Sequence, residues 1–256
     1  MNAALITTGP TRELRRARAA VAICFALNAI FYANLVPRLP EVRDDLRLSN
    51  SALGLALAGL PLGALVLGPA AAVLVRRYSS GLVASYGSVV LAIGVAAVAV
   101  APNWPALAAV LMVVGGMDAI VDVAQNAHGL RVQRGYGRSI LNALHGLWSL
   151  GAVAGGLLGS AAAGLGIPLD RHLGAMAVVF GLVALWIARW MLPGTDDQAT
   201  TEPVTDRPTA GGRSARRSAV IALALLGTLA AAAAFVEDSA SSWSCLLYTS
   251  PSPRDS

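Results

Sequence analysis

The sequence contains few charged residues and no lysine. Charged side chains make up 13% of its 256 residues, and all 19 basic residues are arginine. A soluble globular domain carries about 25% charged residues, whereas hydrophobic residues here reach 56%. The composition therefore argues against a water-soluble enzyme or binding domain and indicates a protein whose solvent is the lipid bilayer.

Cysteine and catalytic motifs are equally scarce. The two cysteines, Cys24 and Cys245, support neither a disulfide framework nor a metal site. The sequence has no His-Glu-x-x-His pair, no Gly-Lys-Ser/Thr phosphate loop and no nucleophile elbow. We expect a protein that is not an enzyme and that holds no cofactor and no metal ion.

Long apolar runs dominate what is present. A helix needs about 20 apolar residues to cross the hydrocarbon core of a bilayer. Such runs recur along the chain and predict an all-α membrane protein with seven transmembrane helices. The predicted spans are Ala17–Val36, Ala52–Val75, Leu82–Ala101, Leu107–Asn126, Ile140–Leu165, Leu173–Leu192 and Ser218–Val236.

Arginine is concentrated in alternate connections between these runs, which is the positive-inside pattern. It predicts a cytoplasmic N-terminus and explains the pI of about 9.9 without a nucleic-acid partner. Richness in Ala, Gly and Arg fits a high-GC bacterial genome, so we expect a multi-pass protein of the bacterial plasma (inner) membrane. The inner set is Arg12, Arg15, Arg16, Arg18, Arg76, Arg77, Arg131, Arg134, Arg138, Arg189, Arg207, Arg213, Arg216 and Arg217, and the outer set is Arg38, Arg43, Arg47 and Arg171.

One connection is long and polar. Residues 193–217 are rich in Thr, Asp, Gly, Pro and Arg, which is typical of a flexible linker. The predicted organisation is a six-helix bundle over residues 1–192, a cytoplasmic linker over 193–217 and a seventh helix within 218–244. Six helices, a long loop and a further helix are the layout of transporters built from two six-helix halves.

The fourth run carries the clearest polar set inside a predicted span. Asp118, Asp122, Gln125 and Asn126 are spaced three or four residues apart and therefore share one face of a helix. Ionisable groups within the bilayer are costly and usually functional. We predict that Asp118 and Asp122 couple transport to protons and that Asn126 contacts solute. The alternative is that the two acids pair with arginine or backbone groups near the helix end.

Polar side chains of the first and fifth runs suggest a solute site. Asn28 and Tyr32 share a face of the first helix, and His145, Trp148 and Ser149 lie within one turn of the fifth. Amide, hydroxyl and imidazole groups beside a Trp ring suit a hydroxyl-rich solute. We predict these five residues to be substrate-binding; hydrogen bonding between helices remains the alternative.

Several segments resemble the fucose-permease-like branch of the major facilitator superfamily. They are Arg38–Ser49 with Leu53–Leu57, Asp122–Asn126, Leu144–Gly151, and Phe235–Asp238 with Ser242–Ser244. The resemblance implies a secondary transporter of a small polar solute, such as a sugar taken up with protons, that is monomeric at full length. Val75 stands where the superfamily usually has an acid after its second helix, so the usual charge relay there is in doubt.

The end of the sequence departs from the resemblance. Residues 245–255 look like the conceptual translation of a transposase-type sequencing adapter. We therefore expect residues 245–256 to be an artefact and the chain to be a transporter truncated after its seventh helix. Two other functions stay open: an efflux carrier for drugs or metabolites within the same superfamily, and, in another class, a non-transporting membrane sensor or membrane enzyme.

Overall fold

The computed structural model describes residues 9–194 together with Val236. The chain divides into two units, Met1–Ala199 and Thr200–Ser256. Helices α1 to α9 all lie in the first unit, and six helical segments among the described residues are long and apolar enough to cross a membrane. The all-α membrane fold is therefore confirmed, whereas most of the linker, the predicted seventh span Ser218–Val236 except its last residue, and residues 245–256 lie outside the described residues.

The first span is longer than its apolar run. Helix α1 (Arg12–Leu35) continues through a 3-10 turn, η1 (Val36–Arg38), into α2 (Leu39–Asp45). The side chain of Thr11 accepts a hydrogen bond from the backbone N–H of Leu14 and so caps the start of the helix. The predicted run Ala17–Val36 covers only the predominantly apolar part of this helix.

The second span is interrupted twice. It consists of α3 (Asn50–Leu57), α4 (Gly59–Leu67) and α5 (Ala70–Tyr78). Pro61 and Pro69 have no backbone N–H, so the helical hydrogen bonds to the carbonyl groups four residues earlier cannot form. The breaks at Ala58 and at Gly68–Pro69 lie close to those two points. The sequence predicted this segment as one run, Ala52–Val75, and the structure corrects that detail.

Four further spans complete the described unit. They are α6 (Ser80–Val98), α7 (Trp104–Tyr136), α8 (Leu141–Gly164) and α9 (Leu169–Ala188). A helix rises about 1.5 Å per residue, so the 33 residues of α7 exceed the thickness of the hydrocarbon core. Its last turns, beyond the predicted end at Asn126, therefore extend past that core.

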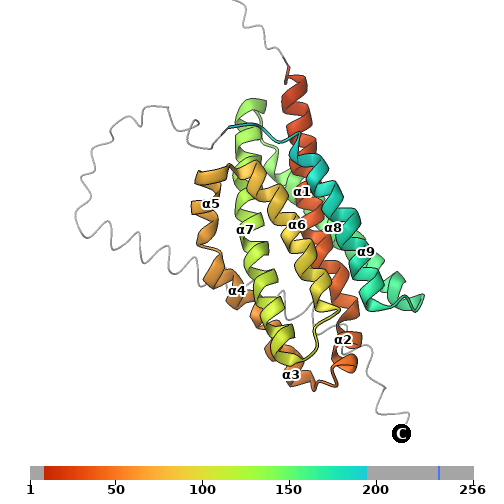
Figure 1. Ribbon diagram of the computed structural model, residues 1–256. Helices are drawn as coiled ribbons and strands as arrows, with labels where there is room; N and C mark the ends of the chain where they lie inside the picture. Colours follow the sequence, from red (N-terminus) through yellow and green to blue (C-terminus); the bar gives the residue numbers. More distant parts are fainter. Residues whose placement is uncertain (1–8, 195–235, 237–256) are drawn as a thin grey trace, which may run out of the picture. The chain divides into compact units, whose positions relative to one another are not determined.

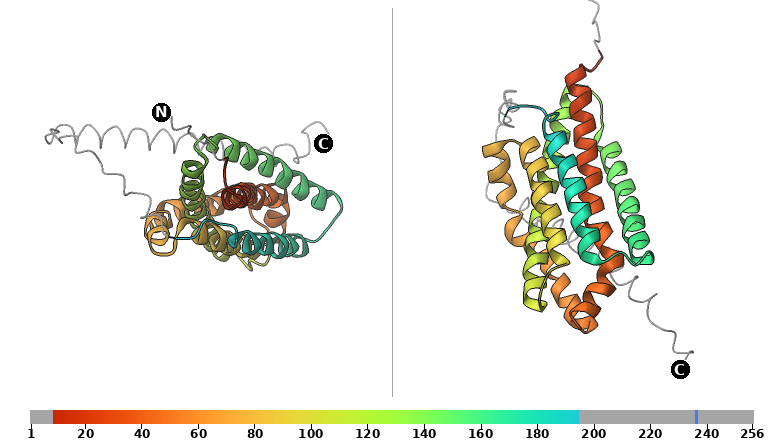
Figure 2. Two further views of the ribbon diagram at one scale, coloured as in Figure 1. Left: turned by 90° about the horizontal axis from the view of Figure 1, so that it is seen from above. Right: turned by 45° about the vertical axis from the view of Figure 1, so that its right-hand side comes forward.

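Helix α1 lies at the centre of the described unit. It contacts α6, α7, α8 and α9, with α8 running along most of its length. Seen along the helix axes, α1 is enclosed while α4 and α5 pack on the far side of α7 (Figures 1 and 2). The core beside α1 contains Cys24, Val75, Ala124 and Ile187. Val75, found where the superfamily usually has an acid, is thus a buried apolar contact.

Glycine permits the closest helix crossings. A Cβ atom placed on Gly151 of α8 would collide with the backbone carbonyl of Ala26 in α1, and one on Gly63 of α4 would collide with that of Met112 in α7. Without a hydrophobic driving force between helices in lipid, close packing at small residues supplies much of the association energy. These two glycines therefore set the spacing of the α1–α8 and α4–α7 pairs.

Substitution of Gly151 tests this packing. We expect Gly151→Ala to destabilise the chain by about 1–3 kcal/mol, because the added methyl group must displace backbone. Gly156→Ala in the same helix is the matched control, since a Cβ there meets nothing within 4 Å. The measurement is the temperature at which the detergent-solubilised chain leaves the monodisperse peak in size-exclusion chromatography. Equal losses in the two variants would contradict the proposed role of Gly151.

Candidate functional site

One asparagine joins three helices in the middle of the bundle. Asn28 of α1 donates from Nδ2 to Oδ1 of Asp118 in α7 at 2.7 Å. The indole Nε1 of Trp148 in α8 donates to Oδ1 of Asn28 at 3.0 Å. Three of the residues predicted from the sequence to form a site therefore belong to one hydrogen-bonded chain, named here the Trp148–Asn28–Asp118 chain.

The orientation of the amide follows from its partners. An indole nitrogen can only donate, so the Asn28 atom beside Trp148 must be the carbonyl oxygen. The amide NH2 group then necessarily faces Asp118. The chain accordingly has one direction, from the Trp148 N–H through the Asn28 amide to the carboxyl group of Asp118.

This arrangement meets the cost of polar groups in a membrane. Asn28 is 5% exposed and Asp118 is half-buried. A carboxyl group at mid-bilayer costs about 2.5–3.5 kcal/mol to insert, and a hydrogen bond to a charged group contributes about 1.5–3 kcal/mol. The hydrogen bond from the Asn28 amide thus offsets part of the cost of placing the Asp118 carboxyl group in an apolar span.

The second acidic residue of α7 has different partners. Asp122 is exposed, and its Oδ1 accepts hydrogen bonds from Gln125 at 3.2 Å and from Asn126 at 3.1 Å. Asn126 also donates to the backbone carbonyl of Asp122 at 2.9 Å. The four polar residues share one side of α7 as predicted, but Asp118 bonds across to α1 whereas Asp122, Gln125 and Asn126 form a local cluster.

The remaining candidate residues line α8 and α1. His145 and Ser149 are exposed, and each side chain bonds a carbonyl one turn earlier in α8, on Leu141 and His145 respectively. The His145 ring packs edge-on against Phe25 with their centroids 5.2 Å apart. Tyr32 is half-buried on α1, one turn beyond Asn28. Solute binding by these residues stays a prediction.

Two buried polar clusters were not predicted. At one end of the bundle Arg38, which is 1% exposed, donates to Glu41 and to the carbonyl oxygen of Ile167 and lies 3.3 Å from Nδ1 of His172. The sequence indicated Arg38 only as an outer-loop residue that reports topology. Its contacts with Ile167 and His172 join the end of α1 to the start of α9. No local sequence pattern predicts a contact between residues so far apart in the chain.

At the other end His128 of α7 is fully buried. Its Nε2 accepts the backbone N–H of Leu192 at 3.2 Å, and its Nδ1 lies 3.1 Å from the hydroxyl of Ser80. Because Nε2 accepts, the proton of the neutral ring is on Nδ1 and is donated to Ser80. Arg131, one turn further on, donates to the carbonyl oxygens of Pro193 and Gly194. These bonds hold α6, α7 and the end of the sixth span together.

No metal centre forms among the residues that the structure describes, since no three His, Cys, Asp or Glu side chains gather there in a way that could hold an ion. The polar side chains of the site are amides, carboxyl groups, hydroxyls, imidazole and indole. Such a set can bind a neutral hydroxylated solute and can hold or release a proton at a carboxyl oxygen.

Removal of the indole donor tests the central chain. Trp148→Phe keeps the ring but leaves the carbonyl oxygen of Asn28 without that donor, so we expect a loss of about 1–3 kcal/mol of stability. Trp186→Phe is the control, because Trp186 is 42% exposed on α9. Thermal unfolding in detergent compares the two. Equal stability of Trp148→Phe and the parent chain would contradict the structural role of this bond.

The relatives of the chain indicate its family. The sequence profile of the Major Facilitator Superfamily matches residues 21–251. The chain is 31% identical over 161 residues to an uncharacterized transporter, y4wD, of Sinorhizobium fredii, and 28% identical over 167 residues to an uncharacterized MFS-type transporter, YPO1221/y2967, of Yersinia pestis. The alignments cover 63% and 65% of this chain, and the chain spans 43% of the length of each relative. No solved structure matches it. The chain belongs to the major facilitator superfamily.

Proposed function

We propose that the chain is part of a secondary active transporter that moves a small polar solute, such as a sugar, together with protons. The observation that carries the proposal is the Trp148–Asn28–Asp118 chain. It joins a carboxyl group of one apolar span to an amide that also bonds the Trp side chain predicted to bind solute. The assignment to the fucose-permease-like branch remains part of this proposal.

Proton coupling is assigned to Asp118 rather than to Asp122. Asp118 is half-buried and bonds across helices to Asn28, whereas Asp122 is exposed and bonds within its own helix. A change of protonation at Asp118 alters a bond between α1 and α7, because an ionised carboxyl accepts the amide N–H more strongly than a neutral one. Asp122 can change its charge without altering any contact between these helices.

Solute binding is assigned to Asn28, Tyr32, Asn126, His145, Trp148 and Ser149. All six lie on α1, α7 and α8, which contact one another around the central chain. The indole N–H of Trp148 is already bonded to Asn28, so its contribution to a solute is the face of the ring. An apolar ring face beside hydroxyl and amide groups fits a sugar, whose rings also present an apolar face and hydroxyl edges.

The orientation proposed from the sequence has support in the fold. The N-terminus of α1, the α5–α6 junction and the C-terminal end of α7 lie at one end of the bundle (Figure 1). These segments carry most of the arginines of the described unit. We place this end in the cytoplasm of a bacterial cell, with the multi-pass chain in the inner membrane.

The first test of the proposal is Asp118→Asn in the full-length gene product. The asparagine carbonyl can still accept the N–H of Asn28, so the fold is kept while the titratable proton is lost. In proteoliposomes carrying an entrapped pH dye, we expect a panel of sugars and polyols to yield a solute that drives proton entry in the parent protein. Asp118→Asn should reduce this signal to background.

Asp122→Asn is the matched control and should retain solute-driven proton entry. Loss of the signal in Asp122→Asn but not in Asp118→Asn would show the proton assignment to be wrong. Stimulation by amphipathic cations but by no sugar or polyol would instead favour an efflux carrier, and a complete lack of transport of any solute would refute the proposed function.

A second test concerns the length of the transporting unit. Sites in carriers of this family lie between two six-helix halves, so we expect the gene to continue beyond Ser244 with about five more apolar runs of about 20 residues each. Sequencing the source gene measures this directly.

We also expect the 256-residue chain alone to give no accumulation of solute in vesicles; accumulation by that chain would contradict the proposed truncation.

A further inference from the structure

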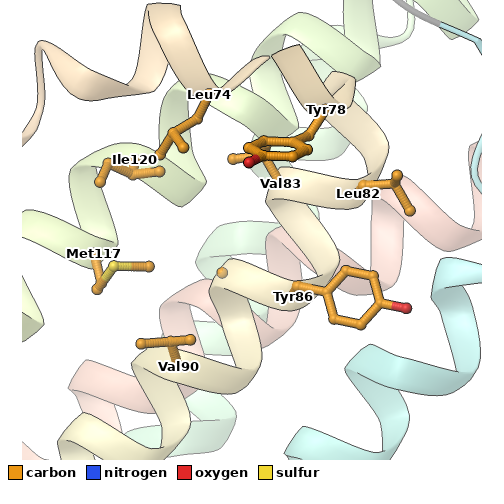
Figure 3. Close-up of a pocket in the computed structure, with 9 residues that line it drawn as sticks. Leu74, Tyr78, Leu82, Val83, Tyr86, Val90, Met117 and Ile120 are labelled. Carbon is orange, nitrogen blue, oxygen red and sulfur yellow. The ribbon is translucent and has the colours of Figure 1, made fainter. Parts of the chain in front are cut away.

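An apolar groove of about 350 Å³ opens on the outside of the bundle where α5, α6 and α7 meet (Figure 3). Its size is within the range of about 300–1,000 Å³ that is usual for ligand pockets. Val83 and Ile120 are buried at its base, whereas Tyr78, Tyr86 and Val90 line it as exposed side chains. The groove is thus built from an exposed apolar surface of three helices, and its lining residues differ from those assigned to solute binding.

One end of the groove is basic. Helix α5 ends in Arg76, Arg77 and Tyr78, and both arginines are exposed. The guanidinium carbon of Arg77 lies 5.5 Å from the centre of the Tyr78 ring, which itself lines the groove. Leu74, three residues before Arg77 and on the same face of α5, is a further lining residue. The Arg77 guanidinium therefore lies beside the apolar wall of the groove, and Arg76 adds a second positive charge at the same end of α5.

These two arginines have no acidic partner in the part of the chain that the structure describes. The ion pairs there join Arg38 to Glu41 and Arg43 to Asp44. A guanidinium group presents its N–H donors in a fork that matches the oxygens of a phosphate. A ligand for this surface needs an anionic group at the arginines and an apolar chain that runs along α6.

We infer that the groove binds one acyl chain of an anionic phospholipid whose phosphate contacts Arg76 and Arg77. Basic pockets between transmembrane helices recognise such headgroups. The ring hydroxyls of Tyr78 and Tyr86 suit the boundary between headgroup and hydrocarbon. A zwitterionic lipid fits less well, because its ammonium group brings a positive charge toward the two arginines.

The experiment uses the full chain in nanodiscs of equal parts phosphatidylglycerol and phosphatidylethanolamine. Native mass spectrometry counts the lipids that stay bound after the nanodisc is removed. We expect the parent chain to retain more phosphatidylglycerol than phosphatidylethanolamine. In the double variant Arg76→Gln/Arg77→Gln, the ratio of retained phosphatidylglycerol to phosphatidylethanolamine should fall roughly fivefold for each arginine removed. The readout is lipid retention, so the result is independent of whether the protein transports a solute.

A matched charge control separates a site from a diffuse field. Arg15→Gln/Arg16→Gln removes the same charge from two exposed arginines at the same end of the bundle, and it should leave the preference unchanged. An unchanged preference in Arg76→Gln/Arg77→Gln, or an equal fall in both double variants, would overturn the inference.

A steric pair tests the position of the acyl chain. Val90→Trp fills the groove from its exposed rim and should lower the number of retained phosphatidylglycerol molecules by about one. Ile93→Trp adds the same ring to an exposed site on α6 outside the groove and should retain the parent number. Both side chains are exposed, so neither substitution disturbs the core. Equal retention by the two variants would show that the lipid does not occupy this groove.

Discussion

The described unit depends on the two hydrogen bonds that the side-chain amide of Asn28 makes to Asp118 and Trp148. Helix α1 is surrounded by α6, α7, α8 and α9, and Asn28 binds two of those four helices at once. In lipid the hydrophobic effect does not choose between neighbouring helices, so close packing and hydrogen bonds decide which helices pair and in what register. Asn28 fixes the rotation of α1 relative to α7 and α8, while Gly151 fixes its distance from α8.

Buried polar side chains also join separate segments of the chain at both ends of the bundle. Arg38 at one end and His128 at the other are buried and bonded to distant segments of the chain. Together with Asn28 they form three polar layers along the bundle, each joining helices that are separate in sequence. Between these layers, small residues such as Gly63 and Gly151 allow close helix crossings. The hydrogen bonds of the three layers thus determine which helices pack together, and the small residues let those helices approach closely.

The sequence predicted the parts of this structure that depend on local composition. The apolar runs located all six described spans, because a membrane helix needs a continuous apolar stretch, but they did not give the polar ends of the first and fourth spans. Hydropathy alone does not reveal the breaks in the second span, because Pro61 and Pro69 remove helical hydrogen bonds without interrupting the apolar run. The extension of α7 to Tyr136 was missed because its last turns are polar and extend beyond the membrane.

In the candidate site, too, the sequence predicted the local features and not the contacts between helices. Helical spacing correctly grouped Asp118, Asp122 and Asn126 on one side of α7, since periodicity is a local property. It could not show that Asp118 pairs with a residue ninety positions earlier, whereas the Asp122–Asn126 bond is a local contact within one turn of α7. The burial of Arg38 and His128 was hidden for the same reason: their partners are chosen by the tertiary fold.

In the proposed mechanism the central chain also supplies a physical link between proton and solute. The Asn28 amide bonds Asp118 through its NH2 group and Trp148 through its carbonyl, so both partners act on one rigid, planar group. A hydrogen bond to an ionised carboxyl is stronger than one to a neutral carboxyl by about 1 kcal/mol. If that difference reaches the Trp148 ring, protonation changes solute affinity by roughly fivefold, within the usual range of coupling energies. Linkage then requires bound solute to change proton affinity by the same factor, so in the proposed mechanism the Asn28 amide is the group through which proton and solute act on each other.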